Sequence, residues 1–337
     1  MTGGGMKLGE ERIPPDEAEV FEALIATNLK TVWMEGTTAK RGQHGKHHGL
    51  AKGTFQVSSD LPEGFAVGVF QPGREYRCQL RFSNGGKLDD TDEDVRGMAI
   101  KLFDVEGKKL LAGRGPSTEQ DFLLVDHPTY FTATMAEYLA FNRHFTPIQD
   151  MRGNGMLPLK VIRALWGLAM LSIFHRKTLK AARMFAGRQV HSILSLTFHS
   201  TTPYLFGEGR AVKYKAVGHG PKGGTLDCDN GLGRSLRDTL RQAPVTFDFG
   251  VIVQTDAIRH PIEDPTVDWE ANGANFISLA KLTLEQQENS SEKDALAEKL
   301  RFNPWMALPE HRPLGFINRA RGEIYRAMSN LRGRKTR

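Results

Sequence analysis

The chain has 337 residues, of which 39% are hydrophobic and 25% are charged. These fractions are ordinary for a soluble globular protein, and the length suffices for one large domain or two smaller ones. The net charge of +6 is concentrated in residues 160–188 and 312–337, but aromatic residues do not alternate with the basic ones, which argues against a nucleic-acid partner.

The chain has two cysteines without CxxC spacing, which disfavours a disulfide framework. Its Gly-rich, charged start lacks the apolar stretch of a signal peptide. A cytoplasmic location is therefore expected.

The first expected element is a leader, residues 1–30. It contains one helix over Pro15–Ala26, because two prolines and Asp16 precede a helical pattern. A helical insert is expected over about residues 132–186, and a second helix over Leu314–Leu331 near the end. The segment Leu284–Lys299 is rich in polar residues and is expected to be an exposed connection.

Strand-like segments lie on both sides of the insert, four before it and four after it. In the clearest of them Val245, Phe247 and Phe249 share one face at period two. Eight strands can close into a barrel, so we expect an α+β fold with an eight-stranded antiparallel β-barrel in one domain, residues 31–337. The expected strands are Gly53–Val57, Tyr76–Ser83, Arg96–Phe103, Asp121–Val125, Val190–Phe198, Arg210–Val217, Val245–Thr255 and Phe276–Leu284.

The longest apolar run is Ala164–Phe174, and basic residues lie on both sides of it. Its length is about half of what a spanning helix needs. Two interpretations stay open: a buried helix with one solvated face, or an interfacial helix that contacts a membrane surface.

Three histidines, His44, His47 and His48, come just before the first strand. Adjacent residues point in opposite directions in an extended chain, which argues against a metal site. Glycines 42, 45 and 49 allow close approach of the backbone to a bound group. Either a solvated cluster or one functional histidine fits this pattern.

The C-terminal helix carries Arg321, Tyr325 and Arg332, whose offsets of four and eleven residues place them on one face. Nearby positive charge stabilises a tyrosinate, and a tyrosinate is a hard anionic ligand for ferric iron. The alternative is a basic surface helix with an incidental tyrosine.

Several segments, in this order, resemble the catalase superfamily, in particular its short catalase-related bacterial haem peroxidases. They are residues 41–46 (RGQHGK) with 53–57 (GTFQV), 80–84 (LRFSN) with 94–101 (DVRGMAIK), 121–126 (DFLLVD), 264–269 (DPTVDW) with 281–284 (KLTL), and 302–304 (FNP) with 321–325 (RGEIY). The resemblance covers about residues 38–332 and implies a barrel of the catalase type that binds haem b.

The resemblance implies a role for individual residues. Tyr325 would be the axial ligand of the haem iron, and Arg321 would keep its phenolate anionic. His44 would be the distal acid/base, with Ser83 as a hydrogen-bond partner; His47 or His48 would replace it in a shifted alignment. Three arginines would face the propionates, namely Arg41, Arg81 and Arg332. An aromatic residue would pack against the haem, either Tyr130 or Phe131.

The chain departs from the family where catalases carry a distal asparagine. Thr118 takes that position, and Gln120 is the nearest amide. Because a second peroxide donor is missing, weak catalase activity is expected beside a haem-dependent peroxidase activity. The resemblance leaves two alternatives: a fatty-acid hydroperoxide isomerase or lyase, and a haem-binding protein without turnover.

The expected substrates are a peroxide with a small organic reductant, or a lipid hydroperoxide. Peripheral membrane contact and a homodimer are left open.

Overall fold

The computed structural model describes residues 7–29, 34–35, 38–39, 44–111, 117–149, 157–186, 189–223, 230–288 and 291–333. The helices are α1 (Glu17–Leu29), α2 (Met135–Gln149), α3 (Leu157–Phe174), α4 (Arg176–Ala186), α5 (Gly231–Gln242), α6 (Ser291–Lys299) and α7 (Phe316–Gly333), with 3-10 turns η2 (Ile193–Ser195) and η3 (Pro309–His311). The strands are β1 (Met34–Glu35), β2 (Thr38–Ala39), β3 (His47–Val57), β4 (Glu75–Asn84), β5 (Arg96–Leu102), β6 (Gln120–Val125), β7 (Thr197–His199), β8 (Tyr204–Leu205), β9 (Ala211–Gly218), β10 (Val245–Val253) and β11 (Phe276–Leu284).

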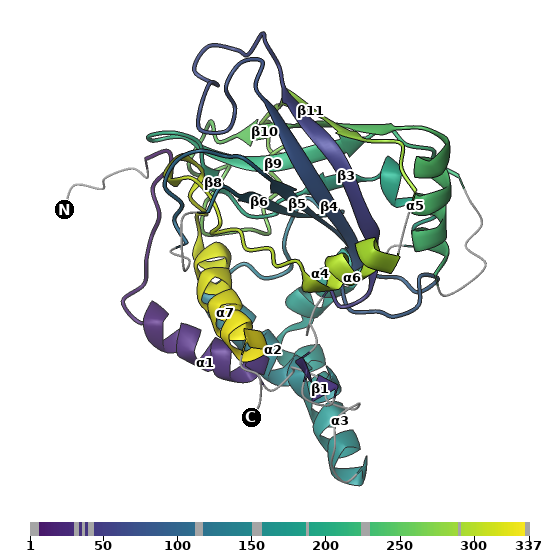
Figure 1. The fold of residues 1–337 in the computed structure, drawn as a ribbon. Coiled ribbons are helices and arrows are strands. Elements are labelled where there is room, and N and C mark those ends of the chain that lie inside the picture. Colours follow the sequence, from purple (N-terminus) through teal and green to yellow (C-terminus); the bar gives the residue numbers. More distant parts are fainter. Residues whose placement is uncertain are drawn as a thin grey trace, which may run out of the picture.

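Eight of the strands form a closed antiparallel barrel (Figure 1). Their order is β10, β11, β3, β4, β5, β6, β7, β9, and β9 pairs again with β10, which closes the ring. The short strand β8 extends the sheet beside β9. The expected α+β fold with an eight-stranded barrel is confirmed.

The inside of the barrel is filled by aromatic side chains at alternate positions of its strands. Phe55 and Phe249 meet edge to face with 5.1 Å between ring centroids, and Phe122 meets Tyr214 at 4.8 Å. These four rings are fully or almost fully buried. The barrel interior is therefore a packed core that fixes the positions of its strands.

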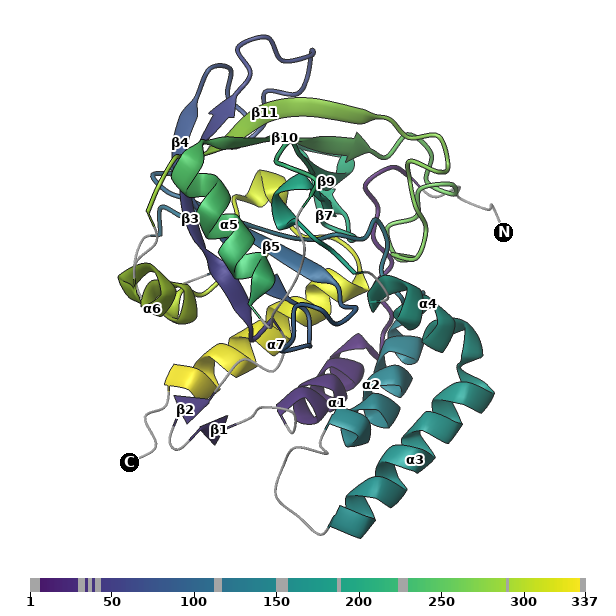
Figure 2. The ribbon, with the colours of Figure 1, turned by 90° about the vertical axis from the view of Figure 1, so that its right-hand side faces the viewer.

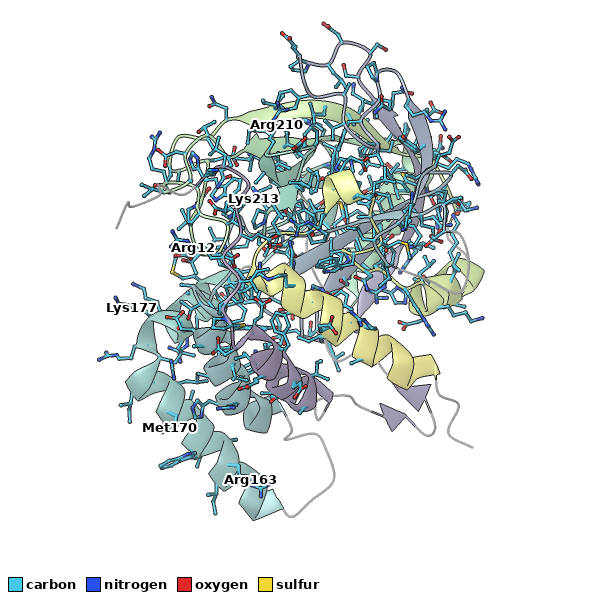
Figure 3. All side chains as sticks on the ribbon, turned by 90° about the vertical axis from the view of Figure 1, so that its left-hand side faces the viewer. Arg12, Arg163, Met170, Lys177, Arg210 and Lys213 are labelled. Carbon is cyan, nitrogen blue, oxygen red and sulfur yellow. The ribbon has the colours of Figure 1, made fainter. Side chains whose placement is uncertain are left out.

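The helices α1, α2, α3 and α7 lie together beneath the barrel, on the side where β3 begins (Figures 1 and 2). A second apolar cluster joins α1, α2 and α7, with Leu24, Tyr138 and Ile317 at its centre. Helices α3 and α4 form the outer edge of this layer, and Arg163 and Lys177 lie there, away from the barrel (Figure 3). We call α1, α2, α3, α4 and α7 the helical layer.

The expected leader is tied into the helical layer. Both carboxylate oxygens of Glu17 on α1 accept hydrogen bonds of 3.0 Å from Nε of Arg319 on α7. Glu11 and Glu263 also pair with Arg319, which is buried. Residues 11–29 thus pack as part of the fold. The proposed division at residue 30 remains a prediction.

Two of the expected elements were wrong. Val190–Phe198 is mostly not a strand: only Thr197–His199 pairs with the sheet, while Ile193–Ser195 form a 3-10 turn. The expected connection Leu284–Lys299 contains helix α6. The helical insert is confirmed, as helices α2, α3 and α4.

Candidate functional site

His44 precedes β3 and lies against the first residues of β5. Its Nδ1 atom and the Oγ of Ser83 on β4 form a hydrogen bond of 3.0 Å, which confirms the expected contact. The ring fits there because Gly97, the β5 partner of Ser83, has no side chain. A Cβ at Gly97 would lie 2.7 Å from His44 Nδ1 and 3.0 Å from Ser83 Oγ.

The backbone of His44 is held in an uncommon conformation. Its φ of +53° lies in the left-handed region, which costs a non-glycine residue about 1–2 kcal/mol. The His44 N–H donates to the carbonyl of Gly85 at 2.7 Å, and Nη2 of Arg81 donates to the His44 carbonyl at 3.0 Å. These bonds offset the strain and fix the direction of the imidazole.

Arg81 is a buried residue of β4 that joins the His44 segment to helix α6. Besides the His44 carbonyl, its Nη2 donates to Gly45 at 3.3 Å, and its Nε donates to the carbonyl of Ala297 at 3.1 Å. The guanidinium therefore binds backbone groups around His44. Its expected contact with a haem propionate remains a prediction.

The other two histidines have structural contacts. His48 is buried, and its Nε2 lies 2.8 Å from Oδ1 of Asn84. Burial is the largest effect on the pKa of His48 and lowers it to about 4. Nε2 of His47 lies 3.2 Å from Glu298. The ring of His44 contacts the Ser83 hydroxyl, whereas His47 is the strand partner of Ser83 in the sheet.

The described residues hold no group of three or more His, Cys, Asp or Glu side chains arranged to bind a metal ion.

Arg321 on α7 lies among four tyrosines. Its charge interacts with the phenols of Tyr325, Tyr130, Tyr204 and Tyr138, and its Cζ lies 5.8 Å from the centre of the Tyr130 ring. Burial lowers the pKa of Arg321, but the four phenols more than offset that effect and raise it above its ordinary value. The guanidinium is therefore a permanent positive charge at this point of α7.

Two polar atoms orient this guanidinium. Nη1 of Arg321 donates to Oγ1 of Thr202 at 3.2 Å and to Oδ1 of Asn318 at 3.3 Å. Asn318 in turn donates to the carbonyl of Pro203 at 2.8 Å, which ties α7 to the segment before β8. The Arg321 side chain is thus held by Asn318 on its own helix and by Thr202 from outside it.

Tyr325 differs from the other three phenols. Burial is the first cause that raises the pKa of Tyr130, of Tyr138 and of Tyr204, the last to about 12, so these three stay protonated at neutral pH. Tyr325 is one helical turn from Arg321 and is only partly buried. It packs against the cluster that joins α1, α2 and α7.

Tyr130 and Phe131 belong to an aromatic cluster that reaches from Arg321 to α4. The two rings stack with 4.5 Å between centroids, and both contact Phe185 on α4, at 5.8 and 5.6 Å. The structure therefore brings Tyr130 to Arg321, while Phe131 packs mainly against Phe141 and Phe185.

Gln120 and Thr118 lie away from His44. Gln120 pairs with Leu102 at the end of β5, five residues from Gly97 and thus roughly 17 Å along the strand. Its Oε1 accepts a hydrogen bond of 2.9 Å from the N–H of Leu308. Thr118 is exposed. The structure does not bring either residue together with His44.

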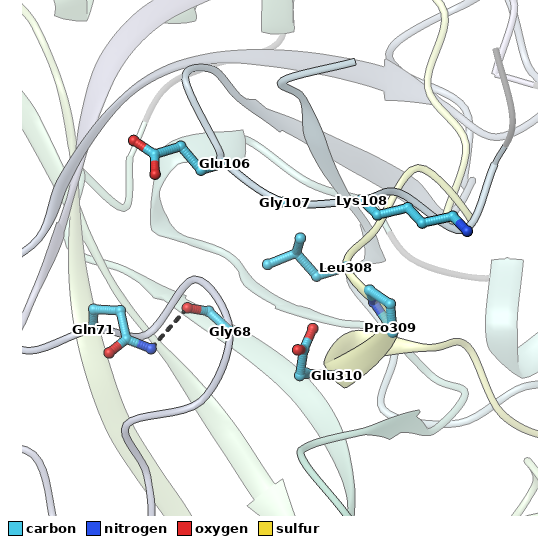
Figure 4. A pocket seen from close by; sticks show the side chains of 8 residues that line it. All are labelled: Gly68, Gln71, Glu106, Gly107, Lys108, Leu308, Pro309 and Glu310. Carbon is cyan, nitrogen blue, oxygen red and sulfur yellow. Dashed lines mark hydrogen bonds between the residues drawn. The ribbon is translucent and has the colours of Figure 1, made fainter. Parts of the chain in front are cut away.

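A surface pocket of about 420 Å³ is lined in part by Leu308, whose N–H bonds to Gln120 (Figure 4). Gly68, Gly107, Leu308 and Glu310 are among the residues that line it. None of the predicted site residues lines it, and we assign it no role in the chemistry.

Two predicted propionate ligands cannot be placed. Arg41 lies outside the described residues, and Arg332 belongs to α7, but its side chain is not among those described. Sequence reasoning missed Tyr138, Tyr204 and the spatial role of Gly97. The first two come from distant segments, so no local pattern marks them, whereas Gly97 lies within the segment that resembles catalases.

Comparison with solved structures identifies the type of barrel. A fungal catalase matches with a TM-score of 0.66 and 18% identity, over 96% of this chain and 64% of its own. Catalase A from Saccharomyces cerevisiae matches with a TM-score of 0.58 and 17% identity, over 96% of this chain and 66% of its own. A bacterial catalase matches with a TM-score of 0.59 and 18% identity, over 99% of this chain and 65% of its own. The chain thus has the catalase fold and spans slightly less than two thirds of these catalases.

No protein-family model and no curated protein matches the sequence. At 17–18% identity, the structural likeness shows the fold alone.

Proposed function

We propose that this protein is a haem-dependent peroxidase that reduces organic hydroperoxides, hydrogen peroxide or both. The observation that carries the proposal is the position of Tyr325 one helical turn from the half-buried charge of Arg321. Helix α7 carries both residues and lies beneath a catalase-type barrel, on the side where His44 precedes β3 (Figures 1 and 2). Tyr325, proposed here as the iron ligand, and His44, proposed as the acid/base group, thus lie on α7 and just before β3, on the same side of the barrel.

The donor set fits haem b. Tyr325 would bind the iron, because Arg321 stabilises a phenolate and a phenolate suits ferric iron. Tyr130 would contact the haem plane, and Arg41 and Arg332 are proposed for its propionates. When bound, haem would supply the two electrons that reduce the peroxide, and an organic donor would return them in one-electron steps.

His44 would move the proton of the peroxide. Ser83 orients Nδ1, so we assign the transfer to Nε2, the other ring nitrogen. Nε2 would accept the proton from one peroxide oxygen and return it to the second, which improves the leaving group as the O–O bond breaks. Arg81 would keep the imidazole in position through the His44 carbonyl.

We propose peroxidase rather than efficient catalase activity because the expected replacements of the distal asparagine, Gln120 and Thr118, do not lie beside His44. Gln120, the nearest candidate in sequence, has its oxygen bonded to Leu308. A second candidate is a fatty-acid hydroperoxide isomerase. The exposed apolar side chains of α3, such as Trp166, favour a lipid substrate.

The test is an absorption spectrum of the haem-supplemented protein beside Tyr325→Phe, followed by addition of cumene hydroperoxide with and without a phenolic donor. We expect a high-spin ferric spectrum that Tyr325→Phe alters, and peroxide loss that depends on the donor. Peroxide loss without a donor would favour the isomerase or catalase activity.

The matched control is Tyr138→Phe, which removes another phenol near Arg321. It should leave the ligand-dependent bands in place. A wild-type preparation that binds no haem would reject the proposal, as would a Tyr325→Phe spectrum identical to the wild type.

A further inference from the structure

Helix α3 exposes an apolar face that no described element covers. Leu165 is 61% exposed and Trp166 66% exposed. At 100° per residue, the exposed large apolar side chains fall within an arc of roughly 160°. They are Val161, Ile162, Leu165, Trp166, Leu168 and Ile173. The opposite face packs on α2, where a Cβ at Gly167 would lie 2.2 Å from the His144 carbonyl. The run is thus a helix with one buried face, and its solvated face carries large apolar side chains.

Helix α4 follows α3 after a single residue and exposes a basic face. Four basic side chains fall within an arc of roughly 120° on this helix, and all are exposed. They are Arg176, Lys177, Lys180 and Arg183. Met184 belongs to the same arc and is 64% exposed. Residues 157–186 contain no Asp or Glu, and in the described part of the chain no carboxylate forms an ion pair with these four.

We propose that α3 and α4 together dock on an anionic lipid bilayer. The apolar face of α3 would enter the boundary between headgroups and acyl chains, and the basic face of α4 would contact the anionic headgroups. Apolar and basic side chains combined in this way are typical of helices that lie in the membrane interface. Trp166 suits that depth, because its ring is apolar and its N–H is polar.

Charge complementarity favours a lipid surface over a second copy of the chain. Two copies meeting through this surface would bring two sets of like charges together without any carboxylate between them. None of the described helices combines the length and apolar character that crossing a bilayer requires. The proposed contact is therefore peripheral.

The docking surface is connected to the candidate site. Phe185 near the end of α4 contacts Tyr130, and Tyr130 lies beneath Arg321. The proposed docking helices thus contact the aromatic cluster beside Arg321, and a lipid hydroperoxide is the substrate class that suits this arrangement. This extension rests on the proposed function, whereas the docking itself does not.

The test is vesicle flotation of the full-length protein, with phosphatidylglycerol vesicles compared with pure phosphatidylcholine vesicles. We expect the wild type to float with the anionic vesicles only. Leu165→Ser with Trp166→Ser should reduce binding at least tenfold. Lys177→Gln with Lys180→Gln should reduce it about 25-fold, at about fivefold for each charge removed.

The matched control is Ile258→Ser, which removes another apolar side chain, 83% exposed, outside this surface; it should float like the wild type. A blue shift of Trp166 emission on adding anionic vesicles, absent in Trp166→Phe, checks the same contact without flotation. The proposal is overturned if the wild type does not float, or if the Leu165/Trp166 variant floats equally well. If the wild type does not float and the Leu165/Trp166 variant abolishes a dimer, this surface joins two copies of the chain instead, and the proposal is overturned. None of these measurements requires haem or turnover.

Discussion

The barrel and the helical layer use their aromatic residues in opposite ways. Inside the barrel, Phe122 and Phe249 are fully buried and contact each other. On the outer edge of the helical layer, Trp166 is 66% exposed. The large side chains of the barrel pack tightly against each other, and this rigid core fixes the positions of His44 and Ser83. The helical layer contributes Arg321 and Tyr325 on its inner side and a contact surface on its outer side.

The sharpest test of this difference is truncation of a barrel ring. Phe122→Ala should lower the free energy of unfolding by about 3–5 kcal/mol, because it removes buried apolar surface and leaves a cavity. Urea unfolding followed by circular dichroism measures the loss. A change below about 1 kcal/mol would contradict the view that the barrel core is tightly packed.

Most of the barrel was predictable because apolar residues alternate with other residues along its strands. The pattern of Val245, Phe247 and Phe249 matches a strand that pairs on both edges. The predicted strand over Val190–Phe198 was mostly wrong. Ile193 and Leu194 are buried in a 3-10 turn, and an apolar pattern alone does not distinguish a buried turn from a buried strand.

The candidate site was predictable only where its residues are close in sequence. Arg321 and Tyr325 share a helix face at i and i+4, so the sequence predicts their proximity. The convergence of Tyr130 and Tyr204 on Arg321 depends on long-range packing that no local pattern encodes. Gln120 was predicted as a distal residue only because its side chain carries an amide. The sequence does not show how far along the sheet Gln120 lies from His44.

The second prediction concerns pH and compares a barrel histidine with an exposed one. His311 is buried among barrel rings; its Nε2 accepts from Val69 N–H at 3.1 Å, and its Nδ1 lies 3.1 Å from the Tyr214 hydroxyl. Burial is the main cause that lowers its pKa to about 3. The ordinary pKa is about 6.5, so the unfolded chain binds a proton first as the pH falls.

Stability should therefore decrease from pH 6.5 downward, by up to roughly 1.4 kcal/mol per pH unit for this one histidine. The full stabilisation is present above pH 6.5 and is lost as the pH falls through 3. His48, with its pKa near 4, should contribute in the same direction. Urea midpoints at pH 7, 6 and 5 give the slope. His311→Gln should reduce it, while the exposed His191→Gln should not; equal slopes in all three proteins would refute the assignment.

The third prediction concerns the space that Gly97 leaves for His44. Gly97→Ala would place a Cβ 2.7 Å from Nδ1 of His44. The imidazole must move, so peroxide turnover should fall at least tenfold, while the overpacking costs about 1–3 kcal/mol of stability. Turnover of the haem-loaded enzyme and its urea midpoint separate the two effects.

Gly86→Ala is the matched control, because a Cβ there meets nothing within 4 Å. Ser83→Ala removes the hydrogen bond without adding bulk and should have a smaller effect than Gly97→Ala. Unchanged turnover in Gly97→Ala would show that the position of His44 is not critical for the reaction.

The smallest effect is expected on the outer edge of the helical layer. Trp166→Ala removes as large a ring as any in the barrel, yet most of that ring is already in contact with water. The hydrophobic contribution depends on the area removed from water on folding, so the free energy of unfolding should change by no more than about 0.5 kcal/mol. Urea unfolding of Trp166→Ala beside Phe122→Ala measures both values under the same conditions. A loss of 2 kcal/mol or more at Trp166 would mean that the ring is covered in solution without any membrane, and the two regions would then not differ as the structure indicates.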